Sequence, residues 1–185
     1  MENIYEITII GRGGQGAKTA SEVLAGAALK LNKHIQAFSE YGAERTGAPI
    51  LSYIRISDTP IFLHTTVTQP DLILIMDDTL TEMASPSPNT KIIINTTQST
   101  QKIKQLLNFN GKVFTFDGTA ISLKILGKNI PNTPALGAIA KVLTLIPKHS
   151  VEQELRDHLE RKIGKEAMDR NIECLNLAYT ELKEA

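Results

Sequence analysis

The sequence Gly11-Arg12-Gly13-Gly14-Gln15-Gly16, at residues 11–16, sets the architecture to expect. It follows a short apolar run at 7–10 and opens an amphipathic segment at 17–31. Glycine lets the backbone adopt a positive φ and approach a ligand closely. Free N–H groups and the positive end of a helix dipole then favour an anion. The stretch therefore predicts a strand, a glycine loop and a helix, and it fits the dinucleotide-binding pattern G-x-G-x-x-G.

This loop supplies the first candidate site residues. Its backbone amides would contact a phosphate or pyrophosphate, and nearby cations would add charge-assisted contacts. The residues proposed for this role are Arg12, Gly13, Gly14, Gln15, Gly16 and Lys18. The alternative is a tight strand-to-helix turn that needs glycine only for packing. Four glycines in six residues exceed what such a turn requires, which favours binding.

Strand and helix patterns alternate along the rest of the chain. Residues 5–10 and 34–39 are expected to be strands that run parallel through a right-handed crossover. Residues 50–56 form a further strand, and 61–64 is expected to return as its hairpin partner, which makes the sheet mixed. We therefore expect an α/β fold, a three-layer sandwich with a mixed, mostly parallel sheet and a Rossmann-like first βαβ unit, in one domain over 1–185.

The second half continues the alternation. Apolar runs predict strands at 72–76, 91–94 and 113–116, and helices are expected at 99–108, 119–126 and 133–145. Thr133 is the expected cap of the last of these, with Pro134 at its first helical position. Two helical stripes follow, separated by a break at Gly164.

Composition limits the possible functions. Lys and Arg total 20 and Asp and Glu total 20, so the neutral chain has no electrostatic footprint for nucleic acid. Cys174 is the only cysteine, which excludes an internal disulfide and an iron–sulfur cluster held by this chain's own thiolates. The four histidines lack zinc spacing. No signal peptide or membrane-length apolar segment is expected, so we predict a cytoplasmic protein that does not contact a membrane.

A second polar segment, at 39–49, follows the predicted strand at 34–39. It contains Glu44 and Arg45 between turn residues, and such a loop beside a phosphate-binding helix is a usual place for recognition. Its alternative is a surface loop with a weak local ion pair. Glu40 lies where a dehydrogenase would place its ribose-binding acid. No plausible acid–base set for hydride chemistry accompanies it, so a stand-alone nucleotide-binding oxidoreductase is the least favoured function.

Four segments together resemble the gamma subunit of 2-oxoacid:ferredoxin oxidoreductases. They are Gly11-Arg12-Gly13-Gly14-Gln15-Gly16-Ala17, Ser39-Glu40-Tyr41-Gly42-Ala43-Glu44-Arg45-Thr46-Gly47-Ala48-Pro49, Asp117-Gly118-Thr119-Ala120 and Pro131-Asn132-Thr133-Pro134-Ala135-Leu136-Gly137-Ala138. The helix around Asn171 is similar too, so the resemblance covers the whole chain. The residues of the second segment are more similar to those of the pyruvate and branched-chain oxoacid members than to those of the 2-oxoglutarate members. Gly118, where many members carry alanine, is a departure.

The resemblance implies a subunit of an enzyme that oxidatively decarboxylates a 2-oxoacid with coenzyme A to acyl-CoA and CO₂. Thiamine diphosphate and the iron–sulfur clusters would lie on the alpha, beta and delta-type partner subunits, which pass electrons to ferredoxin. This chain would contribute to coenzyme A binding and to assembly. The glycine loop would meet the pyrophosphate, and Glu44, Arg45 and Asn132 would line the acyl-transfer side or a subunit interface.

Two interpretations of the resemblance stay open. The chain either holds coenzyme A as a non-redox enzyme subunit, or it is a structural assembly subunit without a ligand. For the isolated chain, a homodimer is the oligomeric state to consider. The particular oxoacid is not fixed by this sequence.

Overall fold

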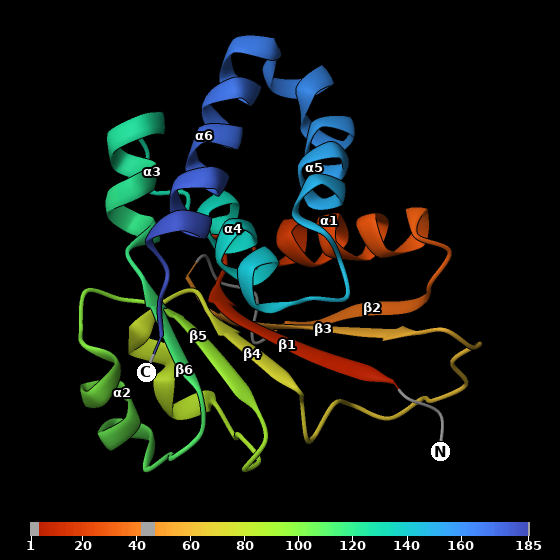
Figure 1. Ribbon diagram of the computed structural model, residues 1–185, viewed down its shortest axis with the longest axis vertical. Helices are drawn as coiled ribbons and strands as arrows, with labels where there is room; N and C mark the ends of the chain where they lie inside the picture. Colours follow the sequence, from red (N-terminus) through yellow and green to blue (C-terminus); the bar gives the residue numbers. More distant parts are fainter. Residues whose placement is uncertain (1–3, 42–46, 185) are drawn as a thin grey trace.

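The computed structural model describes residues 4–41 and 47–184 and is built around a seven-stranded sheet (Figure 1). Its strands are β1 (Tyr5–Arg12), β2 (His34–Tyr41), β3 (Pro49–Ser57), β4 (Leu72–Ile75), β5 (Lys91–Asn95), β6 (Val113–Phe116) and β7 (Lys183–Glu184). Across the sheet the order is β2-β3-β1-β4-β5-β6-β7. The neighbours β1, β4, β5 and β6 are parallel, whereas β3 and β7 run opposite to them. The predicted mixed, mostly parallel sheet is confirmed.

The first βαβ unit differs from the expectation in one respect. β1 and β2 share a direction, but β3 lies between them and pairs antiparallel with both. The expected hairpin strand at 61–64 is wrong, because that segment is not a strand. The place beside β3 that the hairpin would occupy is taken by β2. Eight consecutive residue pairs join these two strands, from His34↔Ser57 to Tyr41↔Ile50, which is more than a four-residue strand at 61–64 could form.

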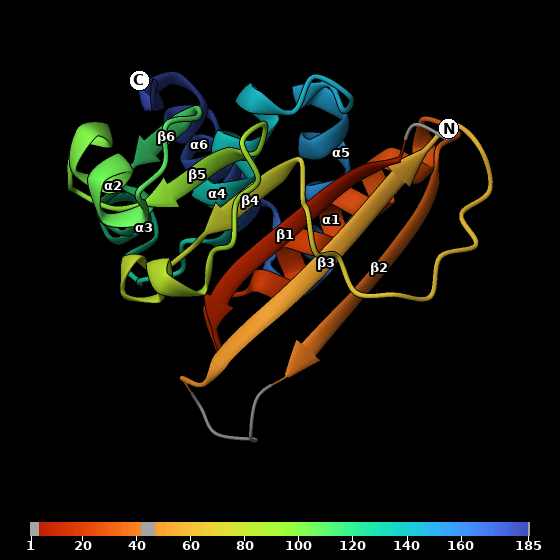
Figure 2. The same ribbon diagram turned by 90° about the horizontal axis from the view of Figure 1, so that it is seen from below.

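Helices cover both faces of the sheet, which gives the predicted three layers. One face carries α1 (Ala17–Lys30), α3 (Gly118–Leu126), α4 (Asn132–Val142), α5 (Lys148–Ile163) and α6 (Lys165–Glu181) (Figure 1). The other face carries α2 (Thr100–Leu107) and the 3₁₀ helix η1 (Asp78–Met83), which pack on β4, β5 and β6. On this second face, no helix among the described residues covers β2 and β3. Figure 2 shows that the segment following β3 crosses this face instead.

α4 is the central helix of the larger layer and is buried along nearly its whole length. Gly137 faces α6 at a point of backbone contact, where a Cβ atom would overlap the carbonyl oxygen of Leu175. The small residue therefore permits the close approach of two helices. This contact fixes α6, and with it the outer wall of the helical layer.

A buried arginine anchors the segment that crosses under β3. Arg55 is 1% exposed, and its Nε donates to the Glu6 carboxylate at 2.7 Å. Its other nitrogens donate to the Gln36 side chain at 3.2 Å and to the Thr65 carbonyl at 2.7 Å. A buried guanidinium requires such complete pairing. Arg55 thereby joins β1, β2 and the segment at 58–70.

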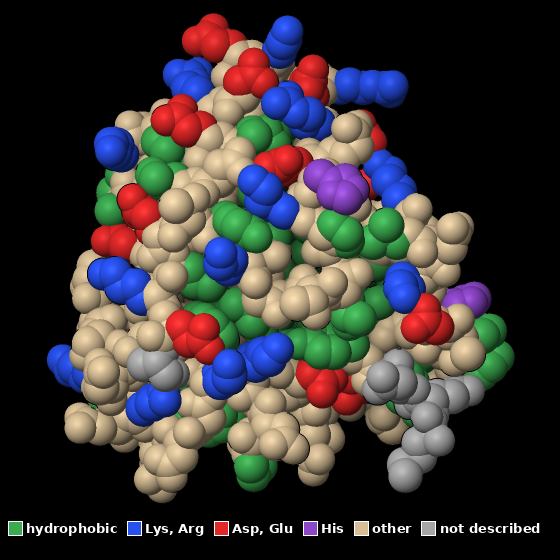
Figure 3. Space-filling model, viewed as in Figure 1, with side chains coloured by type: hydrophobic (Ala, Val, Ile, Leu, Met, Phe, Trp, Pro, Cys, Tyr) green, Lys and Arg blue, Asp and Glu red, His purple; other side chains and the backbone are tan. Residues whose placement is uncertain are grey.

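The outer surface of the helical layer carries charges of both signs, interspersed over α5 and α6 (Figure 3). None of the helices in the described ranges 4–41 and 47–184 is long and apolar enough to cross a bilayer.

Candidate functional site

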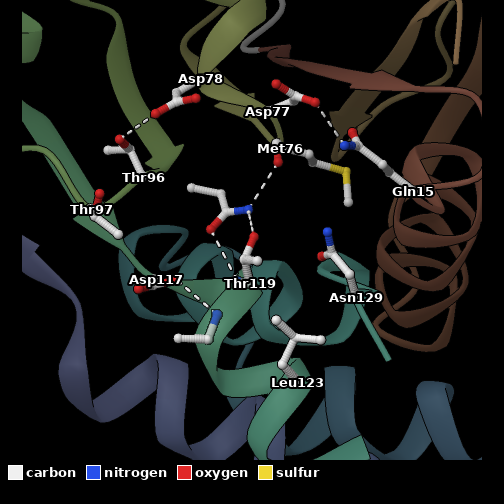
Figure 4. Close-up of a pocket in the computed structure, with 12 residues that line it drawn as sticks. Gln15, Met76, Asp77, Asp78, Thr96, Thr97, Asp117, Thr119, Leu123 and Asn129 are labelled. Carbon is white, nitrogen blue, oxygen red and sulfur yellow. Dashed lines mark hydrogen bonds between the residues drawn. The ribbon is translucent and has the colours of Figure 1, made fainter. Parts of the chain in front are cut away.

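The candidate site lies where the parallel strands β1, β4, β5 and β6 end. Parallel strands present their carboxyl ends at one edge of a sheet, and ligands of open α/β sheets bind at that edge. A cleft of about 380 Å³ opens there (Figure 4). Polar side chains dominate its lining, which consists of Gln15, Met76, Asp77, Asp78, Asn95, Thr96, Thr97, Asp117, Thr119, Ala120, Leu123 and Asn129.

The glycine loop forms one wall of this edge and leads into α1. Gly14 and Gly16 have φ values of 92° and 82°, which L side chains rarely adopt. A Cβ atom on Gly14 would meet nothing within 4 Å, whereas one on Gly16 would lie 2.7 Å from Nδ2 of Asn132. The loop is therefore open at Gly14 and closely packed at Gly16.

Some of the predicted amide donors are already used inside the protein. The Gly13 amide donates to the Ala48 carbonyl at 2.9 Å, and the Gln15 amide donates to the Arg12 carbonyl at 3.0 Å. For the amides of Gly14 and Gly16, no partner is found among the residues that the structure describes. Fewer backbone N–H donors are therefore available to an anion than the sequence predicted.

Arg12 is held by protein groups rather than directed into open space. Its Nε lies 3.1 Å from Oδ2 of Asp77, and its other nitrogens donate to the Gly47 carbonyl at 3.1 Å and to the Thr79 hydroxyl at 2.7 Å. Gln15 donates to the same Asp77 oxygen at 2.9 Å (Figure 4). Its side-chain oxygen accepts from the Arg12 amide at 2.8 Å. Asp77 therefore clamps the glycine loop to the end of β4.

The charge of Asp77 is stabilised by this arrangement. Burial opposes its ionisation, but hydrogen bonds from Thr79 and Gln15 and the charge of Arg12 outweigh burial and lower the pKa of the carboxyl. Because the folded pKa is depressed, the clamp contributes stability above the ordinary aspartate pKa of 3.8. That contribution is lost as the pH falls through the lowered folded value.

Asp77→Asn is expected to loosen the glycine loop. Both carboxylate oxygens act as acceptors, and asparagine replaces one of them with an NH2 donor and removes the charge that faces Arg12. Hydrogen exchange at 12–16 should therefore accelerate about tenfold, equivalent to about 1.4 kcal/mol. Hydrogen exchange followed by mass spectrometry at neutral pH measures this. Asp78→Asn is the matched control, since Asp78 bonds to Thr96 and Gln98 and not to the loop. Equal exchange in the two variants would contradict the clamp.

Asn95 is a site residue that the sequence analysis missed. The residue is buried, with only 7% of its surface exposed. Oδ1 accepts from the amides of Gly118 at 2.8 Å and Thr119 at 3.3 Å, and Nδ2 donates to the Met76 carbonyl at 3.0 Å. Its only signal in the sequence is an amide side chain directly after the buried run at 92–94. Asn95 joins β4, β5 and α3 and forms the floor of the cleft.

The N-terminus of α3 is therefore not available to a ligand. Besides the two bonds to Asn95, the Asp117 carboxylate accepts from the Ala120 amide at 2.8 Å. The three aspartates of the cleft, Asp77, Asp78 and Asp117, also make it unfavourable for a phosphate group.

Asn132 packs against Gly16, at the start of α4. It is 8% exposed, and its Oδ1 accepts from the Thr133 amide at 2.9 Å. A second cavity of about 380 Å³ adjoins it, with apolar walls and two basic residues, Lys128 and Arg170. The full lining is Leu126, Lys128, Ile130, Asn132, Thr133, Leu159, Ile163, Ala167, Arg170 and Asn171.

The other predicted site residues are distributed as follows. Lys18 is exposed on the first turn of α1 and lies 3.7 Å from Glu22. Glu44 and Arg45 lie outside the described residues. The structure thus brings Gly16 and Asn132 together, leaves Gly14 open and places Arg12 in a structural clamp.

Cys174 is buried in the core between the helices. Burial, with a smaller effect of the neighbouring Glu173 charge, raises the pKa of its thiol to about 11. Within the described ranges no group of three or more His, Cys, Asp or Glu side chains could hold a metal ion.

Comparison with known proteins identifies this architecture. Residues 6–181 match the family model described as pyruvate ferredoxin/flavodoxin oxidoreductase. The chain belongs to the pyruvate ferredoxin/flavodoxin oxidoreductase family. Pyruvate synthase subunit PorC from Thermotoga maritima is 39% identical over 182 residues, which are 97% of this chain and 95% of that relative. The pyruvate/ketoisovalerate oxidoreductases common subunit gamma from Thermococcus kodakarensis is 37% identical over 178 residues, 94% of this chain and 96% of the relative.

Solved structures share the fold. The crystal structure of pyruvate oxidoreductase subunit PORC from Thermotoga maritima superposes with a TM-score of 0.89 at 36% identity, covering 100% of this chain and 99% of that one. A 2-oxoglutarate:ferredoxin oxidoreductase from Magnetococcus marinus matches with a TM-score of 0.77 at 17% identity. It covers 97% of this chain and 31% of the longer one, so the same fold occurs there as part of a larger polypeptide. The predicted resemblance to the gamma subunits is confirmed.

Proposed function

We propose that this chain is the gamma subunit of a pyruvate-type 2-oxoacid:ferredoxin oxidoreductase. The complex would convert a 2-oxoacid and coenzyme A to acyl-CoA and CO₂, and this subunit would contribute to coenzyme A binding and to assembly. The observation that carries the enzyme assignment is the match over nearly the full length of both chains to subunits named for pyruvate synthase and for pyruvate/ketoisovalerate oxidoreductases.

The electron-transfer chemistry would belong to the other subunits. A [4Fe–4S] cluster needs about four thiolates, and this chain has one cysteine, whose raised pKa keeps it protonated. Thiamine diphosphate and the iron–sulfur clusters would therefore lie on alpha, beta and delta-type partners, with ferredoxin contacted through them. This subunit would be inactive alone, and it would work in the cytoplasm.

The coenzyme A site would lie between the glycine loop and the start of α4. A pyrophosphate can accept from the amides of Gly14 and Gly16, which lie at the N-terminal, positive end of α1. Asn132 contacts Gly16, and the cavity beside Asn132 combines apolar walls with Lys128 and Arg170. That combination suits a ligand with phosphate groups and a less polar arm.

Gly14→Asp is expected to weaken coenzyme A binding by the assembled complex at least about tenfold, or about 1.4 kcal/mol. The side chain enters open space, so its main effect is a carboxylate beside the phosphate position. Isothermal titration of the purified complex with coenzyme A measures the dissociation constant. Gly14→Asn is the matched control, because asparagine tolerates positive φ and adds no charge.

Equal affinities for the aspartate and asparagine variants would remove the loop from the coenzyme A site. Co-purification tests the rest of the proposal separately, since the tagged chain should recover thiamine-bearing companions that consume a 2-oxoacid. Companions together with unchanged coenzyme A affinity would support the alternative, a structural assembly subunit without a ligand.

A further inference from the structure

The two edges of the sheet are constructed differently. β7 ends one edge as a two-residue strand, and both of its residues, Lys183 and Glu184, are charged. Short charged strands protect a sheet edge from pairing with another chain. β2 ends the other edge, runs for eight residues and contains no proline, and its ladder is with β3 on its inner side (Figure 2). Between His34 and Glu40 it has no charged residue.

The pairing of β2 with β3 determines which backbone groups of β2 point away from the sheet. Neighbouring residues of an antiparallel strand direct their N–H and C=O groups to opposite sides. The bond from the Gly13 amide to the Ala48 carbonyl shows that Ala48 faces β1, so the odd-numbered residues of β3 face β2. Their partners in β2 are the even-numbered residues, such as Phe38 opposite Tyr53. Ile35, Ala37 and Ser39 therefore direct their N–H and C=O groups away from the sheet.

We propose that β2 pairs antiparallel with β2 of a second copy of this chain, about a two-fold axis that passes beside Ala37. In this register Ala37 faces its own equivalent and Ile35 faces Ser39. All of these positions direct hydrogen-bonding groups outward, so the two edges satisfy each other and join the two sheets into one.

The side chains at the alternate positions are complementary in the same register. His34 of one copy lies opposite Glu40 of the other, at both ends of the paired segment. This places an imidazole donor against a carboxylate acceptor twice, and hydrogen-bonding cross-strand pairs stabilise antiparallel strands. Gln36 lies opposite Phe38, so no like charges meet.

Exposed apolar side chains lie along the same margin of the molecule. Gln36 donates to the carbonyls of Ile61 at 3.3 Å and Leu63 at 2.9 Å, which holds this segment against β2. Phe62 is 76% exposed, Leu63 43% and Phe38 36%. Neighbouring exposed apolar side chains of this size mark an interaction surface, and a second copy docked on β2 would cover them.

The proposal is tested by measuring the mass of the purified full chain with light scattering and sedimentation velocity. The wild-type chain should have the mass of two copies. Ala37→Pro should have the mass of one, because proline removes an outward donor and no bond to β3. Ala37→Val keeps the donor and should remain dimeric. Circular dichroism melts establish that both variants are folded.

A charge exchange gives an independent test that does not alter the backbone. His34→Glu places two carboxylates opposite each other at both ends and should raise the dimer dissociation constant at least about tenfold. Adding Glu40→Lys should restore the wild-type value. A monomeric wild-type chain overturns the proposal, as does a dimer that neither Ala37→Pro nor His34→Glu weakens, since that dimer would use another surface.

Discussion

Gly137→Val will lower the free energy of unfolding by about 4 kcal/mol or more. A Cβ atom at this position overlaps the Leu175 backbone, which cannot rotate away as a flexible side chain could. α4 and α6 would have to separate, and the buried side chains between them would lose contact. Urea unfolding followed by circular dichroism gives the midpoint for the wild type and the variant.

Lys141→Val is the control for this substitution. Lys141 is exposed on the same helix, and a β-branched residue there costs only the loss of helix propensity and a surface contact, about 1 kcal/mol. If Gly137→Val had the midpoint of the control, the two helices would not be in backbone contact.

Arg55→Ala is expected to destabilise the protein by about 3 kcal/mol or more. The substitution leaves the Glu6 carboxylate without its cation and the Thr65 carbonyl without its donor, and it opens a cavity under β3. Thermal and urea unfolding measure the loss. Arg55→Met fills the same space without a charge, so the difference between the two variants separates packing from pairing.

An exposed ion pair supplies the comparison for Arg55. Lys33 pairs with Asp58, whose side chain is 82% exposed, and Lys33→Ala should cost less than about 1 kcal/mol. A loss for Arg55→Ala as small as that for Lys33→Ala would show that the buried pair contributes no more than a surface pair.

Local patterns predicted the elements well where a few neighbouring residues determine them. The helix expected at 17–31 is α1 at Ala17–Lys30, and the break expected at Gly164 separates α5 from α6. The cap expected at Thr133 is displaced, because α4 begins at Asn132 with Pro131 before it. Apolar periodicity does not show which strands become neighbours, so the position of β3 was not predicted.

The site depended on contacts between residues far apart in the sequence. Arg12 suits a phosphate when it is considered only with its neighbours, but Asp77 lies 65 positions away and binds it. Asn95 has no periodic or motif signal, and its role depends on α3 beginning beside β5. The glycine conformations, in contrast, follow from residue type, and the positive φ of Gly14 and Gly16 agrees with the expectation.

The position of β3 has a consequence for the order in which the chain can fold during synthesis. Both neighbours of β1, the strands β3 and β4, leave the ribosome after β2. The earliest ladder the growing chain can close is therefore the local one between β2 and β3, and hairpins form within about 1–10 μs. β1 joins the sheet only after this ladder has formed, and until then only α1 covers its apolar face. Once β1 is paired with β3, the strands β4, β5 and β6 can add beside it in sequence order.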